Sequence, residues 1–119
     1  MRNFKELKIW KKGFDIAVKS FKLVSAFPKE ERYGISTQLT KAAVSIPSNI
    51  AEGSSRRSEK DQNRFLEISL GSSFEAETQV LIAAAVNFDD KNIRDEILKD
   101  IEEEQKMLTA FMNRLSIDQ

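Results

Sequence analysis

Apolar residues recur every three or four positions along most of the chain, the spacing that places them on one face of an α-helix. Four such segments, separated by short polar stretches, predict helices over residues 7–26, 33–53, 58–87 and from 92 onward. Ser58 and Asn92 each precede an acidic residue by three positions, as in the capping box that marks a helix start. Short loops between long helices favour antiparallel neighbours. The pattern therefore predicts an all-α fold, an antiparallel up-down-up-down four-helix bundle, as a single domain over residues 1–119.

The first segment has two groups of apolar positions. The main stripe is expected to face the core and consists of Trp10, Phe14, Ala17, Phe21 and Val24. A weaker stripe lies off that face and consists of Ile9, Ile16 and Leu23. Since scattered apolar residues are common on protein surfaces, the second stripe alone requires no partner.

The third segment is also apolar on two sides. Its expected core positions are Phe65, Ile68, Ala76, Ile82, Ala83 and Val86. The opposite side carries Leu66, Leu70, Phe74 and Leu81. A second apolar stripe on a small protein usually marks a partner interface, so we expect these four residues to form an oligomer interface.

The stretch SIPSNIAEG, residues 45–53, interrupts the apolar pattern of the second segment. Pro47 lacks a backbone donor and should kink or loosen the helix there. The polar residues around it match polar residues on the core side of the third segment, so we expect a structural polar seam made of Asn49, Glu52, Ser72 and Glu75. Buried carboxylates in such a seam would need basic partners.

Charge is unevenly distributed although the formal net charge is zero. Residues 1–41 contain ten basic and four acidic residues, and residues 42–119 contain nine and fifteen. The first segment gathers the candidate nucleic-acid-binding residues Lys5, Lys8, Lys11, Lys12, Lys19 and Lys22. Two interpretations stay open: a basic surface for an anionic partner, or neutralisation between neighbouring helices or subunits.

Composition argues against catalysis. The sequence has no histidine, the commonest general base and transition-metal ligand, and no cysteine for nucleophilic chemistry. A carboxylate-only Mg²⁺ site at Glu52 and Glu75 is disfavoured beside the structural seam. We therefore predict no enzyme activity, no catalytic residues, no metal and no cofactor. Without a signal peptide, a long apolar span or cysteines, the expected location is the cytoplasm, with no membrane partner.

Several motifs occur in the order typical of one family. They are FKELKIW at 4–10, FPKE at 27–30, YGISTQL at 33–39, AAVSIPSNIAEG at 42–53 and FLEISLGSSFE at 65–75. With them the chain resembles the four-helix-bundle proteins encoded in intervening sequences of bacterial 23S ribosomal RNA genes, relatives of the accessory variability protein of diversity-generating retroelements. The resemblance implies a ring-like homopentamer without known catalytic activity. For the retroelement relative it also implies binding of nucleic acid and reverse transcriptase by a strongly basic surface.

Two functions follow from these features. The first is a non-enzymatic homo-oligomer, a pentamer by the resemblance, that binds RNA or DNA, or a nucleic-acid-associated protein, through the basic face of its first helix. The second is a protein-interaction scaffold without nucleic acid, for which the acidic fourth segment would suit a basic partner. The zero net charge separates this chain from strongly basic relatives.

Overall fold

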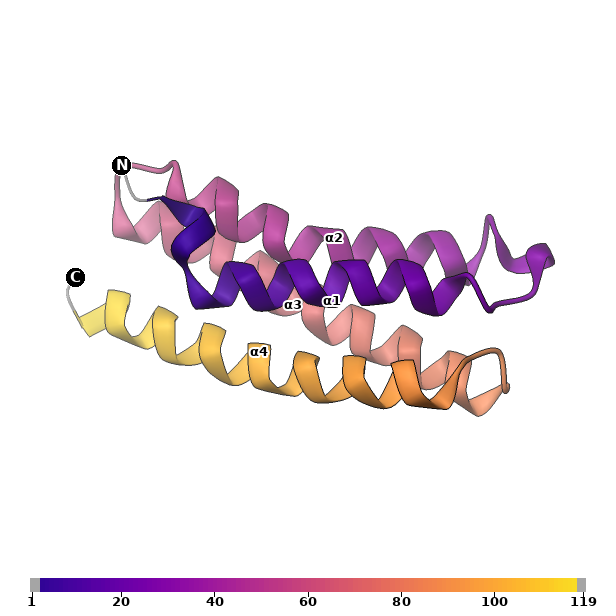
Figure 1. The fold of residues 1–119 in the computed structure, drawn as a ribbon. Helices are drawn as coiled ribbons and strands as arrows, with labels where there is room; N and C mark the ends of the chain where they lie inside the picture. The colour runs from indigo at the N-terminus through magenta and orange to yellow at the C-terminus, as the bar shows by residue number, and fades with distance from the viewer. Residues whose placement is uncertain (1–2, 118–119) are drawn as a thin grey trace.

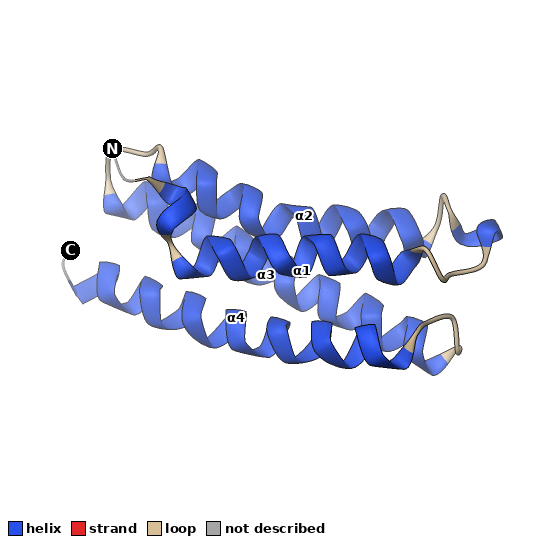
Figure 2. Ribbon diagram, in the orientation of Figure 1, coloured by secondary structure: helices blue, strands red, loops and turns tan. Residues whose placement is uncertain are grey.

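In a computed structural model, residues 3–117 of the chain form four long helices joined by short loops. These are α1 (Lys8–Val24), α2 (Ile35–Ser54), α3 (Glu59–Ala85) and α4 (Lys91–Ile117) (Figure 1). Short 3-10 helices precede α1 (η1, Phe4–Glu6) and α2 (η2, Lys29–Glu31). No strand occurs within residues 3–117 (Figure 2). The predicted segments match the observed helices to within a few residues.

The helices run alternately up and down an elongated body of 46 × 22 × 20 Å (Figure 1). The first helix, α1, also contacts the last, α4. Each helix packs against the two beside it, α1 on α2, α2 on α3, α3 on α4 and α4 on α1. One hydrophobic cluster takes residues from all four helices. The predicted all-α antiparallel bundle is therefore confirmed.

Local side chains explain where α3 and α4 begin. The Ser58 hydroxyl accepts a hydrogen bond from the backbone N–H of Asp61 at 3.1 Å, as its position before α3 predicts. At α4 the Asp90 carboxylate accepts from the N–H of Asn92 at 2.8 Å. Asp90, rather than the expected Asn92, therefore caps α4. Between them, Asn87 adopts φ 62°, a left-handed conformation that ends α3.

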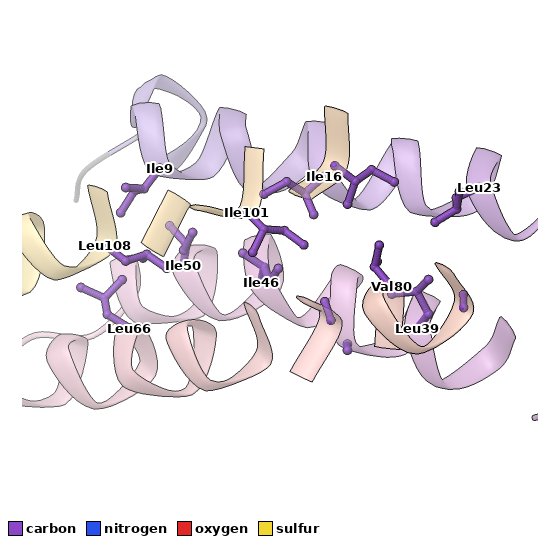
Figure 3. Packing of buried hydrophobic residues seen from close by; sticks show 14 of the residues in the cluster. Ile9, Ile16, Leu23, Leu39, Ile46, Ile50, Leu66, Val80, Ile101 and Leu108 are labelled. Atoms are coloured by element: carbon purple, nitrogen blue, oxygen red, sulfur yellow. The ribbon is translucent and has the colours of Figure 1, made fainter. Parts of the chain in front are cut away.

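The core face of α1 is not the one predicted. Ile9, Ile16 and Leu23 are buried. They are spaced along α1, and their side chains point toward core residues of the other helices (Figure 3). Phe14 and Phe21 are 48% and 55% exposed. The aliphatic stripe, set aside in the sequence as the weaker one, packs inside because its unbroken i, i+7 spacing meets the isoleucines and leucines of α2 and α4. The prediction that Phe14 and Phe21 form the core was wrong.

The faces of α3 are also partly exchanged. Leu66 is fully buried in the core, so its assignment to an oligomer interface was wrong, and Leu70 is half-buried against the core. Phe74 and Leu81 are exposed, each to 51%. Of the expected core positions, three are exposed instead: Ile68, Ile82 and Val86. The physical reason is that small residues, including Ser69, Ser73 and Ala76, occupy the innermost face of α3 and displace the larger ones to its flanks.

Helix α2 continues through Pro47 without a break. Pro47 is buried, and the helix is assigned unbroken from Ile35 to Ser54. The proline therefore removes one hydrogen-bond donor without ending the helix. Pro47 lies next to α1, since a Cβ atom at Gly13 would be 3.3 Å from the Pro47 backbone nitrogen.

Candidate interaction surface and interhelical contacts

The exposed aromatic residues of α1 form an apolar groove with α2. We call this the α1–α2 groove, a depression of about 380 Å³. Its lining residues are Trp10, Phe14, Ala17, Val18, Phe21, Val44, Pro47, Ser48 and Ala51. The rings of Trp10 and Phe14 lie 5.3 Å apart, centroid to centroid, and form one wall. Short side chains of α2 leave the opposite wall low, so the groove can accept side chains of another molecule.

Basic side chains flank this groove on α1. With about 3.6 residues per helical turn, Lys11 and Lys22 project on the side of α1 next to Phe14 and Phe21. Lys8 and Lys22 are exposed, as are Lys11 and, in η1, Lys5. Four of the six predicted nucleic-acid-binding lysines are thus available to a partner.

The remaining two lysines are engaged within the bundle. Lys12 Nζ lies 2.7 Å from Glu103 Oε2 and 3.5 Å from Asp100 Oδ1. Lys19 Nζ lies 2.6 Å from Asp100 Oδ2 and 3.6 Å from Glu96 Oε1. We call these five residues the α1–α4 ladder. For Lys12 and Lys19, neutralisation between neighbouring helices is the correct interpretation of the charge asymmetry.

Hydrogen bonds within the ladder shift the pKa values of its members. The bond to Glu103 raises the pKa of Lys12, and the bond to Asp100 raises that of Lys19, in both cases against partial burial. The Lys12 ammonium in turn lowers the pKa of Glu103. All three shifts favour the charged forms of Lys12, Lys19 and Glu103.

Hydroxyl and amide groups join α2 to α3. The hydroxyls of Ser45 and Ser72 lie 2.7 Å apart, and Asn49 Nδ2 donates to Ser45 Oγ at 2.8 Å. Deeper in the bundle, Ser69 Oγ donates to the carbonyl of Ile46 at 2.9 Å. We call these the α2–α3 seam, defined by Ser45, Asn49, Ser69 and Ser72. The structure brings together the predicted Asn49 and Ser72, with Ser45 as the link between them.

The two carboxylates predicted for this seam are not in it. Glu52 is exposed and pairs with Arg56 at 2.6 Å, one turn along the chain. Glu75 is also exposed, and accepts a hydrogen bond from Gln79 Nε2 at 3.4 Å. Charged groups remain in water where a neutral hydroxyl can fill the buried position, because burial of a charge costs more. Their assignment to the seam was wrong.

A buried acid was missed in the sequence. Glu104, within the run EEEQ of α4, is fully buried, and neither of its carboxylate oxygens has a hydrogen-bond partner. Burial raises the pKa of Glu104 to about 8, although the nearby Lys12 charge acts in the opposite direction. The sequence signal was its position: Glu104 lies three residues after Ile101 and four before Leu108, on the apolar face of α4.

Metal and membrane sites are not found in the described part of the chain. Residues 3–117 contain no group of three or more acidic side chains placed to hold a metal ion. No helix in this range is long and apolar enough to cross a membrane.

Comparisons with known proteins agree with this fold. Residues 5–110 match the family described as 23S rRNA-intervening sequence protein. A crystal structure from Bacteroides thetaiotaomicron VPI-5482, a protein of unknown function from the S23 ribosomal protein family, superposes with a TM-score of 0.77. It shares 23% identity over 87% of this chain and 97% of its own, which shows a common fold. No curated protein matches the sequence. Because the family match covers most of the sequence, the chain belongs to the 23S rRNA-intervening sequence protein family.

Proposed function

We propose that the protein is a non-enzymatic homo-oligomeric module of the cytoplasm, whose copies associate through the α1–α2 groove. The observation that carries this proposal is the groove itself, since it leaves Phe14 and Phe21 about half exposed. Large apolar side chains gathered in a depression are typical of a surface that another molecule covers. Burying each of them would contribute on the order of 1.5–3 kcal/mol to association, before the cost of ordering the subunits.

The surface that we propose for the other side of the contact is the exposed strip of α3. Phe74 and Leu81 are two turns apart on one side of that helix, each half exposed. Glu67 of α3 is exposed near the same side, whereas Lys11 and Lys22 flank the groove. Opposite charges beside two apolar surfaces suit a contact between different faces of two copies.

A contact between different faces closes into a ring when its rotation divides a full turn. The family resemblance supports five subunits, a number that the contact alone does not determine. A ring would repeat the exposed lysines around one assembly and so concentrate positive potential. We propose that it binds RNA or DNA through the phosphate backbone, using the exposed Lys5 and Lys8, since Lys11 and Lys22 flank the proposed subunit contact. Protein scaffolding without nucleic acid is the alternative function, and the zero net charge favours it.

Light scattering on purified variants tests the assembly. We expect Phe21→Glu, in the groove, and Phe74→Glu, on α3, each to reduce the mass to that of a monomer without loss of helical content. The matched control is Ile82→Glu, an equally exposed apolar residue on another side of α3, which should leave the mass unchanged. Monomeric wild-type protein at micromolar concentration would contradict the proposal.

Mixing the two monomeric variants identifies the geometry of the contact. Phe21→Glu leaves the α3 strip intact, and Phe74→Glu leaves the groove intact. Since the proposed contact joins groove to strip, the mixture should form a heterodimer through one repaired interface. Two variants that stay monomeric together would contradict a contact of groove to strip, whereas a dimer of either variant alone would show that its intact face pairs with itself.

Salt-dependent binding separates the two functions. We expect affinity for structured RNA or duplex DNA to fall steeply as salt rises, and to be lost when Lys5 and Lys8 are replaced by Gln. Replacement of Lys19 by Gln is the control, because that side chain is held by Asp100. Absence of binding at low salt would leave the scaffold function.

A further inference from the structure

The buried carboxyl group of Glu104 lies where three helices meet. It is contributed by α4, is fully buried and has no hydrogen-bond partner on either oxygen. Gly13 of α1 makes the space for it: a Cβ atom at Gly13 would lie 2.9 Å from Glu104 Oε2. The same point is 3.1 Å from Ile46 Cγ2 and 3.3 Å from the backbone nitrogen of Pro47, both of α2. Only glycine at position 13 leaves the acid in its place.

No hydrogen bond to either carboxylate oxygen of Glu104 stabilises a negative charge at this point. The backbone nitrogen of Pro47, which lies beside Gly13, carries no hydrogen and cannot donate. From α1 the charged group is Lys12, whose ammonium is already held by Glu103 at 2.7 Å and Asp100 at 3.5 Å. On α3 the charged side chain that reaches α4 at this level is another acid, Glu77, which accepts a hydrogen bond from Gln105. An ionised Glu104 would be a buried charge that accepts no hydrogen bond.

We propose that Glu104 is a proton-operated lock on the packing of α1, α2 and α4: the bundle closes around the neutral carboxylic acid, and loss of that proton loosens the three helices where Gly13 and Pro47 meet. The lock is a property of each subunit and does not depend on assembly.

The direction of the pH effect follows from proton linkage. Burial raises the pKa of Glu104 from 4.5 to about 8 in the folded chain. Between these two values the folded state holds a proton that the unfolded state has released. The folding equilibrium constant should therefore fall by up to about tenfold per pH unit as pH rises through this window, and level off above it.

Few other groups interfere in this window. The sequence contains no histidine. The Glu103 pKa is lowered from 4.5 and those of Lys12 and Lys19 are raised from 10.5, so these groups titrate outside it. A stability change between pH 5 and 8 reports mainly on Glu104.

Urea unfolding at fixed protein concentration, from pH 5 to pH 9, tests the lock. For the wild type we expect stability to decline up to about pH 8 and then become constant. Glu104→Gln should abolish the decline, because glutamine fills the same space without ionising. Glu103→Gln is the matched control, an acid one residue away that pairs with Lys12; it should keep the decline. Lys12→Met should extend the decline to higher pH, since it removes the charge that favours ionisation.

A measurement on the unmodified protein keeps the test decisive if Glu104→Gln fails to fold. Unfolding the wild type at pH 6.5 in weak buffer should release about one proton per chain. Release of no proton would overturn the proposal, as would parallel pH profiles for the wild type and Glu104→Gln. A carboxyl resonance of Glu104 that titrates in the ordinary range of exposed glutamates would overturn it too.

Discussion

The α2–α3 seam and the α1–α4 ladder join neighbouring helices by opposite chemistry. The seam uses neutral hydroxyls and an amide, with Ser45 and Ser72 in direct contact at 2.7 Å. The ladder uses lysines and acids, with Lys19 and Asp100 at 2.6 Å. Small neutral groups let two backbones approach, whereas long charged side chains reach across from the edge of the bundle and keep their ends near water. The seam should therefore respond to changes in side-chain volume, and the ladder to salt and pH.

The largest effect is expected at Gly53, where α2 lies directly against α3. A Cβ atom there would lie 3.1 Å from the Gln62 carbonyl oxygen and 3.1 Å from Phe65 Cβ. We expect Gly53→Leu to lower the free energy of unfolding by about 2–3 kcal/mol, as overpacking typically does. Urea denaturation measures this change, which should be independent of salt.

Gly71 is the matched control for this substitution. It lies within α3 and is exposed, and nothing would lie within 4 Å of a Cβ atom there. Gly71→Leu should be neutral or stabilise the protein by about 0.5–1 kcal/mol, since glycine is a poor helix former. If both variants lost the same free energy of unfolding, the close contact of α2 with α3 would not be the reason that position 53 requires glycine.

A smaller effect is expected from Ser69, the deepest member of the seam. Its hydroxyl donates to Ile46 on the neighbouring helix, and Ser69→Ala should cost about 1 kcal/mol. The control is Ser73→Ala, because the equally buried Ser73 donates only to Leu70 of its own helix at 2.6 Å. Urea midpoints of the two variants compare an interhelical bond with a local one. Similar midpoints would mean that the seam adds no stability through Ser69.

The sequence determined the four helices and their order more securely than the faces they present. Spacing of apolar residues and the cap at Ser58 predict the elements because both are local. The orientation of α1 is not local: its two apolar stripes are both helical in period, and the partner helices decide which one packs inside. Phe14 and Phe21 were assigned to the core from the regular spacing of their stripe, but they line the groove instead.

The polar contacts were also predicted only in part. Asn49 and Ser72 were placed correctly because short polar side chains on an apolar helix face have few other partners. Glu52 and Glu75 were not, since a long side chain near a helix edge can turn outward to water. Glu104 shows the opposite case: it looks like one more acid in a charged run, although its spacing from Ile101 and Leu108 places it on the apolar face, and Gly13 on another helix leaves the space for it.

The smallest effect is expected in the ladder, from the pair Lys19 and Asp100. A double-mutant cycle with Lys19→Met and Asp100→Asn should give a coupling below about 1 kcal/mol, because both side chains are only partly buried and water screens the pair. The coupling should shrink further between low and high salt, whereas a cycle on Ser45 and Ser72 should not change. Hydrogen bonding to Asp100 raises the pKa of Lys19 above 10.5, so the folded state holds this proton more tightly than the unfolded state. The contribution of Lys19 is therefore complete below pH 10.5 and is lost as pH rises through its raised pKa, well apart from the window of Glu104. A coupling energy in the ladder that does not change with salt, or one in the seam that does, would contradict the distinction between the two contacts.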